Sequence, residues 1–337
     1  MNFELENKLK ESLAPPLGGR WPEAKRGYDA ARGLTVFERG WLSSNNILFV
    51  GKDSTALVDT GYCTHADQTL ALVQSALKDR PLDHIINTHL HSDHCGGNAA
   101  LQAAYSAANA TVQTHIPYGL AKHVASWDDE ALSYKPTGQN CPRFTFEHTL
   151  KQGDEVRLGD TRWQVHAAPG HDPHSIILFE PDTRTLISAD ALWENGFGVV
   201  FQELEGERAF DEVAQTLDVI EGLNPQTVIP GHGAVFAGDE VKAALAVARK
   251  RLDGFVQNPL KHTRYAVKVL LKYKLLELQT ISESAFIHWA KSTLYFEMVR
   301  GRWFADEPME TWVSGYIEEL IAGGAARRAD SQILNIR

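Results

Sequence analysis

The sequence predicts an α/β protein in which two β-sheets pack face to face with helices on their outer faces, followed by a helical C-terminal region. Two observations carry this prediction. Before about residue 238, short apolar runs typical of strands alternate with segments of helical periodicity. After Asp239 helical periodicity dominates almost to the end of the chain. The mixed order of strands and helices in the first part favours two sheets covered by helices.

Residues 1–33 are expected to form a leader that precedes the folded domain. Pro15-Pro16 and Gly18-Gly19 interrupt it, and such dipeptides mark turns and loops. Leucines spaced four residues apart near its start indicate a short amphipathic helix. The segment lacks the apolar run that a secretory signal needs.

Residues 34–238 are predicted to form the α/β domain. Strands are expected over 34–37, 46–50, 55–58, 83–87, 111–114, 156–158, 163–167, 176–179, 185–188 and 227–229. Helices are expected over 66–78, 98–108 and 208–222, where apolar residues recur at helical spacing. Residues 117–143 lack any periodicity, and so long a loop in a compact domain is usually functional. We expect it to be a substrate lid, with a partner contact as the alternative.

Residues 239–337 are predicted to form a second, helical domain. Helices are expected over 239–257, 264–278, from Thr280 onward and over 308–322, with a strand or hairpin over 329–336. Three helices and a terminal hairpin are similar in outline to a winged helix. The helix before the hairpin carries Glu310, Glu318 and Glu319, which would repel phosphate. Nucleic acid is therefore not the expected partner.

Charge and composition narrow the class of protein further. The formal net charge is −10, yet residues 241–337 hold 15 basic against 10 acidic residues. This basic tail could attract an anionic substrate, although simple solvation of helix faces is the plainer interpretation. No apolar run is long enough to span a membrane. Three cysteines are a sparse and odd set, which favours a reducing, cytoplasmic location. Whether the protein forms a homodimer is left open.

The strongest functional signal is the segment Asn87–Gly97, which follows a short buried strand. It places His89, His91, Asp93 and His94 within six positions. Imidazoles and carboxylates are ligands for borderline divalent metals such as zinc. The segment therefore predicts a metal site at the end of that strand.

Three later segments share one format, in which a predicted strand ends in a metal-type ligand. His171 follows Pro169-Gly170, Asp190 ends a strand, and His232 follows Pro230-Gly231. Strand ends at one edge of a layered α/β fold converge in space. We therefore expect these side chains to join the Asn87–Gly97 segment in one site.

In this order, the motifs resemble those of the metallo-β-lactamase superfamily, in the two-metal hydrolase branch typified by glyoxalase II and the N-acyl homoserine lactonases. The resemblance covers about residues 34–236 and implies an αββα sandwich with two divalent ions at one edge. Zinc is the expected metal, with iron or manganese as alternatives. By motif position, the resemblance implies that His89, His91 and His171 hold one ion, that Asp93, His94 and His232 hold the other, and that Asp190 bridges both.

The resemblance also implies the chemistry, which is hydrolysis by a metal-bound hydroxide that attacks a carbonyl carbon. Asp93 would orient the hydroxide. An aspartate at position 190 points to thioesterases and lactonases, and the predicted substrate is a small-molecule thioester or other small acyl ester. The alternatives are a lactone or a β-lactam-like amide and, less favoured, an RNA phosphodiester. After His171 the sequence departs from the thioesterase pattern His-Thr-x-Gly-His, since Asp172 and His174 follow.

Aromatic residues near these motifs are predicted to wall the substrate pocket. The predicted pocket residues are Trp193, Phe197 and Phe201 after Asp190, and Trp127 and Tyr134 in the long loop. Ordinary core packing is an equally good interpretation of the first three. Asp59, which ends a strand, and His174 are predicted to orient ligand histidines by hydrogen bonds. For His174, a purely structural role is an equally good interpretation.

Overall fold

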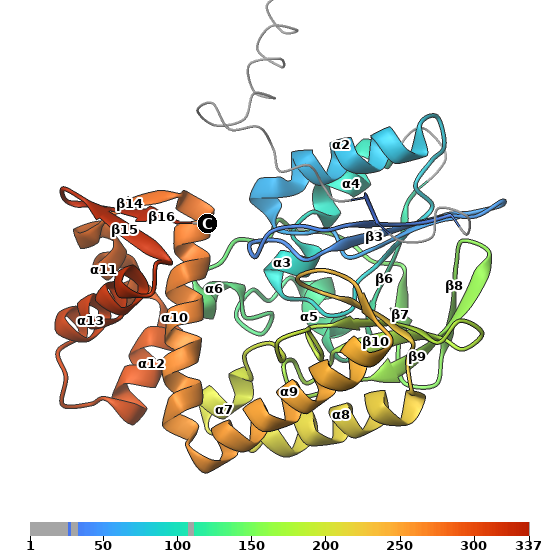
Figure 1. The fold of residues 1–337 in the computed structure, drawn as a ribbon. Coiled ribbons are helices and arrows are strands. Elements are labelled where there is room, and N and C mark those ends of the chain that lie inside the picture. The colour runs from blue at the N-terminus through green and yellow to red at the C-terminus, as the bar shows by residue number, and fades with distance from the viewer. Residues whose placement is uncertain (1–25, 28–32, 107–110, 337) are drawn as a thin grey trace, which may run out of the picture.

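A computed structural model describes residues 26–27, 33–106 and 111–336, and their side chains from residue 33 onward. Most of the predicted leader 1–33, including its short helix, therefore lies outside the described residues. The same holds for the last residues of the helix predicted over 98–108. The described residues form two stacked sheets with helices outside them, and a helical region beside them (Figure 1).

The first sheet is built from the N-terminal part of the chain. Its strand order is β1-β2-β3-β4-β5-β6-β7. These strands are β1 (Arg26–Gly27), β2 (Leu34–Phe37), β3 (Asn46–Val50), β4 (Thr55–Val58), β5 (His84–Ile86), β6 (Gln113–Pro117) and β7 (His148–Leu150). Strands β1 to β4 pair antiparallel and β4 to β7 pair parallel. Helices α2 (Ala66–Leu77) and α4 (Asn98–Tyr105) cover its outer face.

The second sheet has the strand order β13-β12-β11-β10-β9-β8. These strands are β8 (Glu155–Leu158), β9 (Thr161–Ala167), β10 (Ile176–Glu180), β11 (Thr185–Ala189), β12 (Thr227–Pro230) and β13 (Phe236–Ala237). Only β11 and β12 pair parallel among them. Helices α8 (Phe210–Leu223) and α9 (Asp239–Gln257) cover its outer face.

Alternation along the strands explains why the layers form. In β3, Ile47 and Phe49 enter the core between the two sheets, whereas Leu48 packs with α2 and α4. In β11, Ile187 enters the same central core, whereas Leu186 packs with α8 and α9. Successive strand side chains point to opposite faces, so each fully apolar strand fills two layers of core. The predicted αββα sandwich is confirmed.

The segment 117–143, expected to be a substrate lid, contains several short helices. It contains η4 (Tyr118–Leu120), α5 (Ala121–Ser126) and α6 (Tyr134–Thr137). Val124, Leu132 and Tyr134 are buried in one cluster with Leu90 and Cys95 of the metal-ligand loop. Much of the segment therefore packs against that loop. Ser133, Thr137 and Gln139 line the cavity at the metal-type side chains, so the role of the segment as a lid stays a prediction.

The C-terminal region consists mainly of helices with a small sheet. Its elements are α10 (Pro259–Leu278), β14 (Thr280–Ser282), α11 (Glu283–Ser292), α12 (Leu294–Trp303), α13 (Met309–Ala322), β15 (Ala326–Ala329) and β16 (Gln332–Asn335). The predicted terminal hairpin is present as β15–β16, and β14 pairs with β16. The third predicted helix begins at Glu283 rather than Thr280. Residues 280–282 are taken up by the sheet, and Ser282 Oγ caps the helix by accepting from the Ala285 N–H.

The packing of helix α9 indicates where the boundary between the two domains lies. Its buried face, including Val241, Leu245 and Leu252, belongs to the core shared by α8 and the second sheet. A boundary after residue 238 would separate this helix from its own core. We therefore propose that the sandwich domain extends to Asn258, where Pro259 begins α10.

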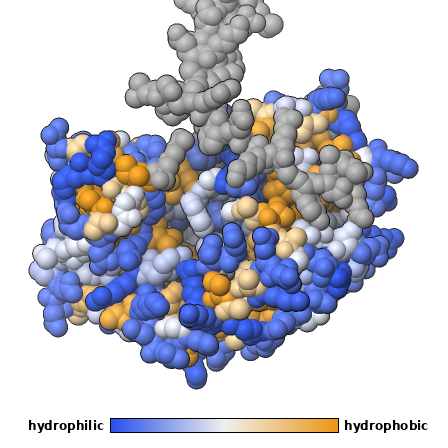
Figure 2. Space-filling view, in the orientation of Figure 1, coloured by the Kyte–Doolittle hydropathy of each residue, from blue (hydrophilic) through white to orange (hydrophobic). Residues whose placement is uncertain are grey.

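Remaining short helices are η3 (Cys63–His65), α3 (Ser92–Cys95) and α7 (Phe201–Glu205). Among the described residues, no helix is long and apolar enough to cross a membrane. The face seen in Figure 2 is largely hydrophilic, with hydrophobic side chains in small groups. The cytoplasmic location stays a prediction from the cysteine content.

Candidate metal centre

Two groups of metal-type side chains lie side by side at one edge of the sandwich. One group is His89, His91 and His171, and the other is Asp93, His94, Asp190 and His232. The ligand atoms within each group lie within 4.8 Å of one another. Sequence segments far apart are thus brought together as predicted: the loop and helix after β5, and the ends of β9, β11 and β12.

Backbone contacts hold the segments from the two sheets against each other. The Ser44 N–H donates to the Asp93 carbonyl at 2.9 Å, and the Asn45 N–H donates to the Gly231 carbonyl at 2.7 Å. The Asn45 side chain also donates to the carbonyl of Pro230 at 3.0 Å. The loop before β3 therefore ties the helix that carries Asp93 to the turn that carries His232.

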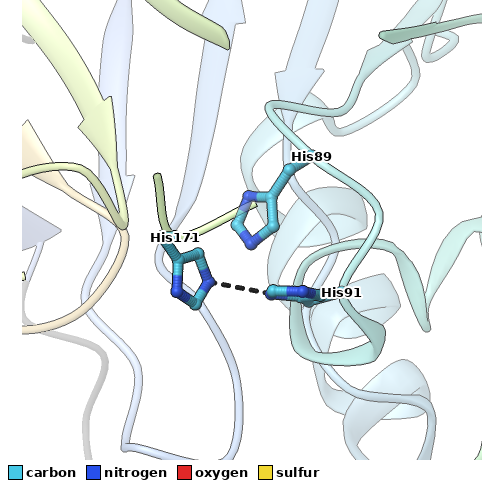
Figure 3. Close-up of side chains that lie close together, drawn as sticks. All are labelled: His89, His91 and His171. Carbon is cyan, nitrogen blue, oxygen red and sulfur yellow. Dashed lines mark hydrogen bonds between the residues drawn. The ribbon is translucent and has the colours of Figure 1, made fainter. Parts of the chain in front are cut away.

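The first group is shown in Figure 3, where the imidazoles of His89 and His91, from the loop after β5, and of His171, after β9, point toward one another. His91 Nδ1 and His171 Nε2 are 2.8 Å apart. The ring centroid of His89 is 4.7 Å from that of His91 and 5.1 Å from that of His171. Three imidazole nitrogens that converge in this way are typical of a transition-metal site.

The second group is centred on Asp190. Its Oδ1 lies 3.3 Å from His94 Nε2 and 3.8 Å from His232 Nε2. Its other oxygen, Oδ2, lies 3.4 Å from His171 Nε2 of the first group. Asp93 Oδ2 lies 3.2 Å from His232 Nε2. One oxygen of Asp190 therefore faces each group.

Two glycines are required by this packing. A Cβ atom at residue 231 would lie 2.3 Å from Asp190 Oδ1, and one at residue 198 would lie 2.3 Å from His171 Nδ1. Contacts that short do not occur between real side chains. Glycine is thus required in the Pro-Gly-His turn at His232 because the Asp190 carboxylate leaves no room for a Cβ atom.

The second nitrogen of several histidines is occupied by an oxygen partner. His94 Nδ1 lies 2.8 Å from Asp59 Oδ2, and His171 Nδ1 donates to the Val199 carbonyl at 2.6 Å. His89 Nδ1 lies 3.1 Å from Thr88 Oγ1. Such partners fix the tautomer of a metal-ligating histidine and leave the opposite nitrogen free.

Those opposite nitrogens supply the test of whether a metal fits. Nε2 of His89 and Nε2 of His94 are buried and have no hydrogen-bond partner. Buried polar atoms in proteins are normally satisfied. Orphaned imidazole nitrogens that face carboxylate oxygens and other imidazoles form a donor set that suits a divalent transition metal.

The charges in the site also favour a cation. Burial lowers the pKa of His89 well below its usual value and that of His91 to about 4, so both rings are neutral, the form that binds metal. Burial opposes a charge on His94, but the carboxylates of Asp190 and Asp59 outweigh it and raise its pKa well above the usual value. The carboxylates therefore draw positive charge into this space.

Asp59 is placed to orient His94, and this contact leads to a testable prediction. Asp59 also accepts hydrogen bonds from the N–H and Oγ1 of Thr88. Replacing Asp59 by Asn keeps the volume but removes the charge, and is expected to weaken metal affinity by about 10–100-fold. Metal titration by calorimetry measures this directly.

A matched control lies at the other end of the same strands. Asp83, just before β5, accepts from the Thr55 N–H at 2.8 Å. Asp83→Asn removes a comparable carboxylate contact away from the metal groups and is expected to leave metal affinity unchanged. Equal losses of metal affinity in both variants would mean that Asp59 acts only on the fold.

A cavity of about 90 Å³ opens onto the two groups. Of the five predicted pocket residues, Trp193 and Phe201 line it. Trp193 Nε1 donates to Asp190 Oδ1 at 3.2 Å, and the Phe201 ring lies 5.2 Å from that of His91. These two aromatic residues stand at the expected place beside the metal groups.

Three other predicted pocket residues do not line the cavity. Phe197 is buried in the core of the second sheet and its helices. Tyr134 is buried under the ligand loop, where its hydroxyl donates to the Leu90 carbonyl, and Trp127 packs against the same cluster. These three rings pack against apolar side chains instead of facing the cavity. His174 is exposed and its ring stands over Gly119; within the described part of the chain its side chain makes no hydrogen bond to a ligand histidine, so it does not have the orienting role predicted for it.

Other cavity residues were missed by sequence reasoning. The Trp41 ring is stacked on that of His232 at 5.5 Å, and α10 contributes Tyr265 and Tyr273 to the wall. Trp41 follows the end of β2, so its place at a strand end was a usable signal. Nothing local in the sequence indicates that α10 packs against the mouth of the cavity.

Comparison with known proteins places the chain in a family. The αββα layers and the His/Asp groups at one edge support a metal-dependent hydrolase. The sequence model of the metallo-beta-lactamase superfamily matches residues 39–232, more than half of the chain. The chain belongs to the metallo-beta-lactamase superfamily, and the resemblance inferred from its motifs is confirmed.

Individual relatives are more distant. A hydroxyacylglutathione hydrolase from Brucella anthropi is 29% identical over 50% of this chain, and the match spans only 53% of that relative. The acyl-coenzyme A thioesterase MBLAC2 from Homo sapiens is 26% identical over 61% of this chain and 80% of its own length. A probable metallo-hydrolase, YflN, from Bacillus subtilis is 26% identical over 67% of this chain and 94% of its own.

Solved structures extend the likeness of fold beyond the sandwich. A beta-lactamase domain protein from Burkholderia ambifaria aligns with a TM-score of 0.57 at 20% identity, covering 98% of this chain and 100% of that one. The B3 metallo-beta-lactamase BLEG-1 aligns with a TM-score of 0.52 at 20% identity, covering 64% of this chain and 99% of that one. The first alignment shows that the C-terminal region also has a counterpart of similar fold.

Proposed function

We propose that this protein is a dinuclear metal-dependent hydrolase whose substrate is a small-molecule thioester. The observation that carries the proposal is the position of Asp190, with Oδ2 facing the first group and Oδ1 facing the second. A carboxylate placed in this way suits two neighbouring cations rather than one.

The residues would divide between the two ions as the motifs predict. His89, His91 and His171 would hold one ion, Asp93, His94 and His232 the other, and Asp190 would contact both. Bound divalent ions supply an activated water and an electrophile for the carbonyl oxygen. Zinc is the metal that we propose, because imidazole and carboxylate ligands suit it; iron and manganese are the alternatives to be tested.

The protein's own groups orient the reactants. Asp93 lines the cavity and faces His232, so its carboxylate is placed to accept a hydrogen bond from a water and hold it toward the substrate. Burial raises the pKa of Tyr273 well above its usual value, which keeps the phenol protonated. Tyr273 lines the cavity and is hydrogen-bonded to Ser92 at 3.1 Å, so it is placed to donate to a bound substrate.

Cys95 does not compete with this chemistry as a nucleophile. Its side chain is buried beneath the ligand loop, and burial raises its pKa well above the usual value, so the thiol stays protonated. A thiolate is the reactive form of cysteine. The position next to His94 is therefore explained by packing.

Two relatives point to the thioester class. Their names, hydroxyacylglutathione hydrolase and acyl-coenzyme A thioesterase, designate hydrolysis of an acyl group carried on a thiol. Thiols have a pKa near 8.5, far below that of an alcohol, so thiolate departs readily once the carbonyl is attacked. No strongly basic leaving group then has to be protonated by the site.

A substrate panel tests the proposal. The metal-loaded full chain is assayed against acylglutathione and acyl-coenzyme A thioesters, an acyl homoserine lactone, a β-lactam and a phosphodiester. Thioesters are expected to show a kcat/KM about tenfold or more above every other class, a difference of about 1.4 kcal/mol in transition-state binding. Hydrolysis of the lactone or phosphodiester alone would overturn the thioester assignment.

A further inference from the structure

A second hollow lies outside the metal centre, between α9 and α10, which follow each other in the chain and meet at an angle (Figure 1). Its volume is about 820 Å³, far larger than the 90 Å³ of the cavity at the metal groups. We call it the α9–α10 groove. Its cationic lining residues are Lys250, Arg251, Lys261, Arg264 and Lys268.

The groove is strongly basic although the chain carries a net charge of −10. Its one carboxylate, Glu319, lies 3.1 Å from Lys268 Nζ and is neutralised by it. The other four cations have no carboxylate within ion-pair distance in the part of the chain that the structure describes. Lys261, Arg264 and Lys268 recur at helical spacing on α10, so they share one face. Such a cluster attracts an anion rather than stabilising the fold.

Arg251 is held in a fixed position at this site. Its guanidinium carbon lies 4.3 Å from the ring centre of Tyr265 and 5.4 Å from that of Phe255. Its Nη1 donates to the Asn195 carbonyl at 3.2 Å, while Nε and Nη2 are buried without a hydrogen-bond partner. A guanidinium held in this way keeps its positive charge fixed at the wall of the groove, where it attracts an anion.

The groove lies beside the metal cavity. Tyr265 lines both, so its ring forms a wall that the two hollows share. Arg251 contacts Asn195 in the same loop that carries Asp190 and Trp193. A Cβ atom at Gly196 would lie 2.8 Å from Nη1 of Arg251, so this loop is shaped around the guanidinium. A ligand seated in the groove would therefore lie next to the metal cavity.

We propose that the α9–α10 groove binds the phosphate groups of a nucleotide-bearing leaving group, so that the substrate is a thioester of the coenzyme A type rather than a glutathione thioester. This inference rests on the proposed function. Several phosphates match several unpaired cations, and Val247 and Tyr265 offer apolar surface to a base. The only anionic groups of glutathione are its two carboxylates, and this short tripeptide would leave most of the groove unfilled.

Binding of the isolated nucleotide part tests the groove without any hydrolysis. Adenosine 3′,5′-bisphosphate is titrated into the metal-loaded full chain by calorimetry, with inorganic phosphate in a parallel titration. The double variant Lys261→Glu/Arg264→Glu is expected to bind the bisphosphate about tenfold or more weakly, because each replacement turns an attraction into a repulsion. Lys151→Glu, in the turn between β7 and β8, is the control of equal charge change per site.

Kinetics separate this inference from the proposed function. The double variant is expected to lose about tenfold of the wild-type preference, in kcat/KM, for an acyl-coenzyme A over the same acyl group on N-acetylcysteamine, which carries no phosphate. Thioester hydrolysis with an unaltered preference would overturn the groove and leave the proposed function standing. Bisphosphate binding that depends on the groove, without hydrolysis of any thioester, would overturn the proposed function instead.

The binding assay also distinguishes a coenzyme from other anions. Equal affinity for inorganic phosphate, or tighter binding of a single-stranded oligonucleotide than of the bisphosphate, would overturn the assignment to a coenzyme.

Discussion

Replacing Asp190 by Asn is expected to reduce hydrolytic turnover by about 10³-fold or more while leaving the fold intact, since even residues that only orient a metal ligand cost about 10–100-fold when removed. The carboxylate faces both metal groups, so its amide counterpart loses a negative charge from each. Turnover on the best thioester and metal content by elemental analysis measure the effect. Far-ultraviolet circular dichroism checks the fold.

A glycine pair provides an independent control for this prediction. Gly231→Ala would bring a Cβ atom to 2.3 Å from Asp190 Oδ1, so it should displace the carboxylate and reproduce most of the loss. Gly222→Ala in α8 makes the same chemical change where nothing lies within 4 Å, and should leave turnover unchanged. Full activity in Asp190→Asn would remove the basis for a dinuclear site.

Removing the metal is expected to abolish turnover and to destabilise the protein. A ligand that binds only the folded state contributes about 4 kcal/mol at a thousandfold excess over its Kd. For a chain of 337 residues, the loss should lower Tm by roughly 6 °C. Thermal unfolding with and without a chelator, together with an activity assay, measures both effects, and added metal should restore them.

The Asp190→Asn variant serves as the control for chelation. Because its site is already impaired, its Tm should respond to the chelator less than that of the wild type. Undiminished thioester hydrolysis in a chain stripped of metal would contradict the proposed function outright. An unchanged Tm with lost activity would confine the role of the metal to chemistry.

Much of the metal centre could be read from the sequence because its residues stand at strand ends. His171, Asp190 and His232 each follow a buried strand, and strands that run in the same direction deliver their ends to one edge. The pairing of β11 with β12 is parallel, which places Asp190 and His232 together. Local sequence patterns were sufficient to predict this site, because the direction of each strand determines the edge of the sheet at which its last residue lies.

Only part of the pocket could be read in this way. Phe197, Trp127 and Tyr134 are aromatic and near the motifs, yet they pack in cores. Trp41 and Tyr273, which do line the cavity, are no more conspicuous in the sequence. Whether an aromatic ring faces a core or a cavity depends on neighbours from distant segments, and these neighbours appear only when the chain is folded.

The same reason explains the errors in the elements. β7, β13 and β14 are only two or three residues long, too short for a period to show, and are held by pairing with distant strands. The strand expected over 111–114 lies at Gln113–Pro117 instead. Helix α9 has the periodicity expected of it, but periodicity does not say which core its apolar face will join.

By itself the sequence determined the αββα layers, the ligand types and their order along the chain, because strand alternation and strand-end motifs are local properties. Only the tertiary structure decided that Asp190 faces both groups, that α10 walls the cavity, and that the cations of α9 and α10 form one groove. Those features depend on how strand ends and helices pack against one another in three dimensions, and no local sequence pattern encodes that packing.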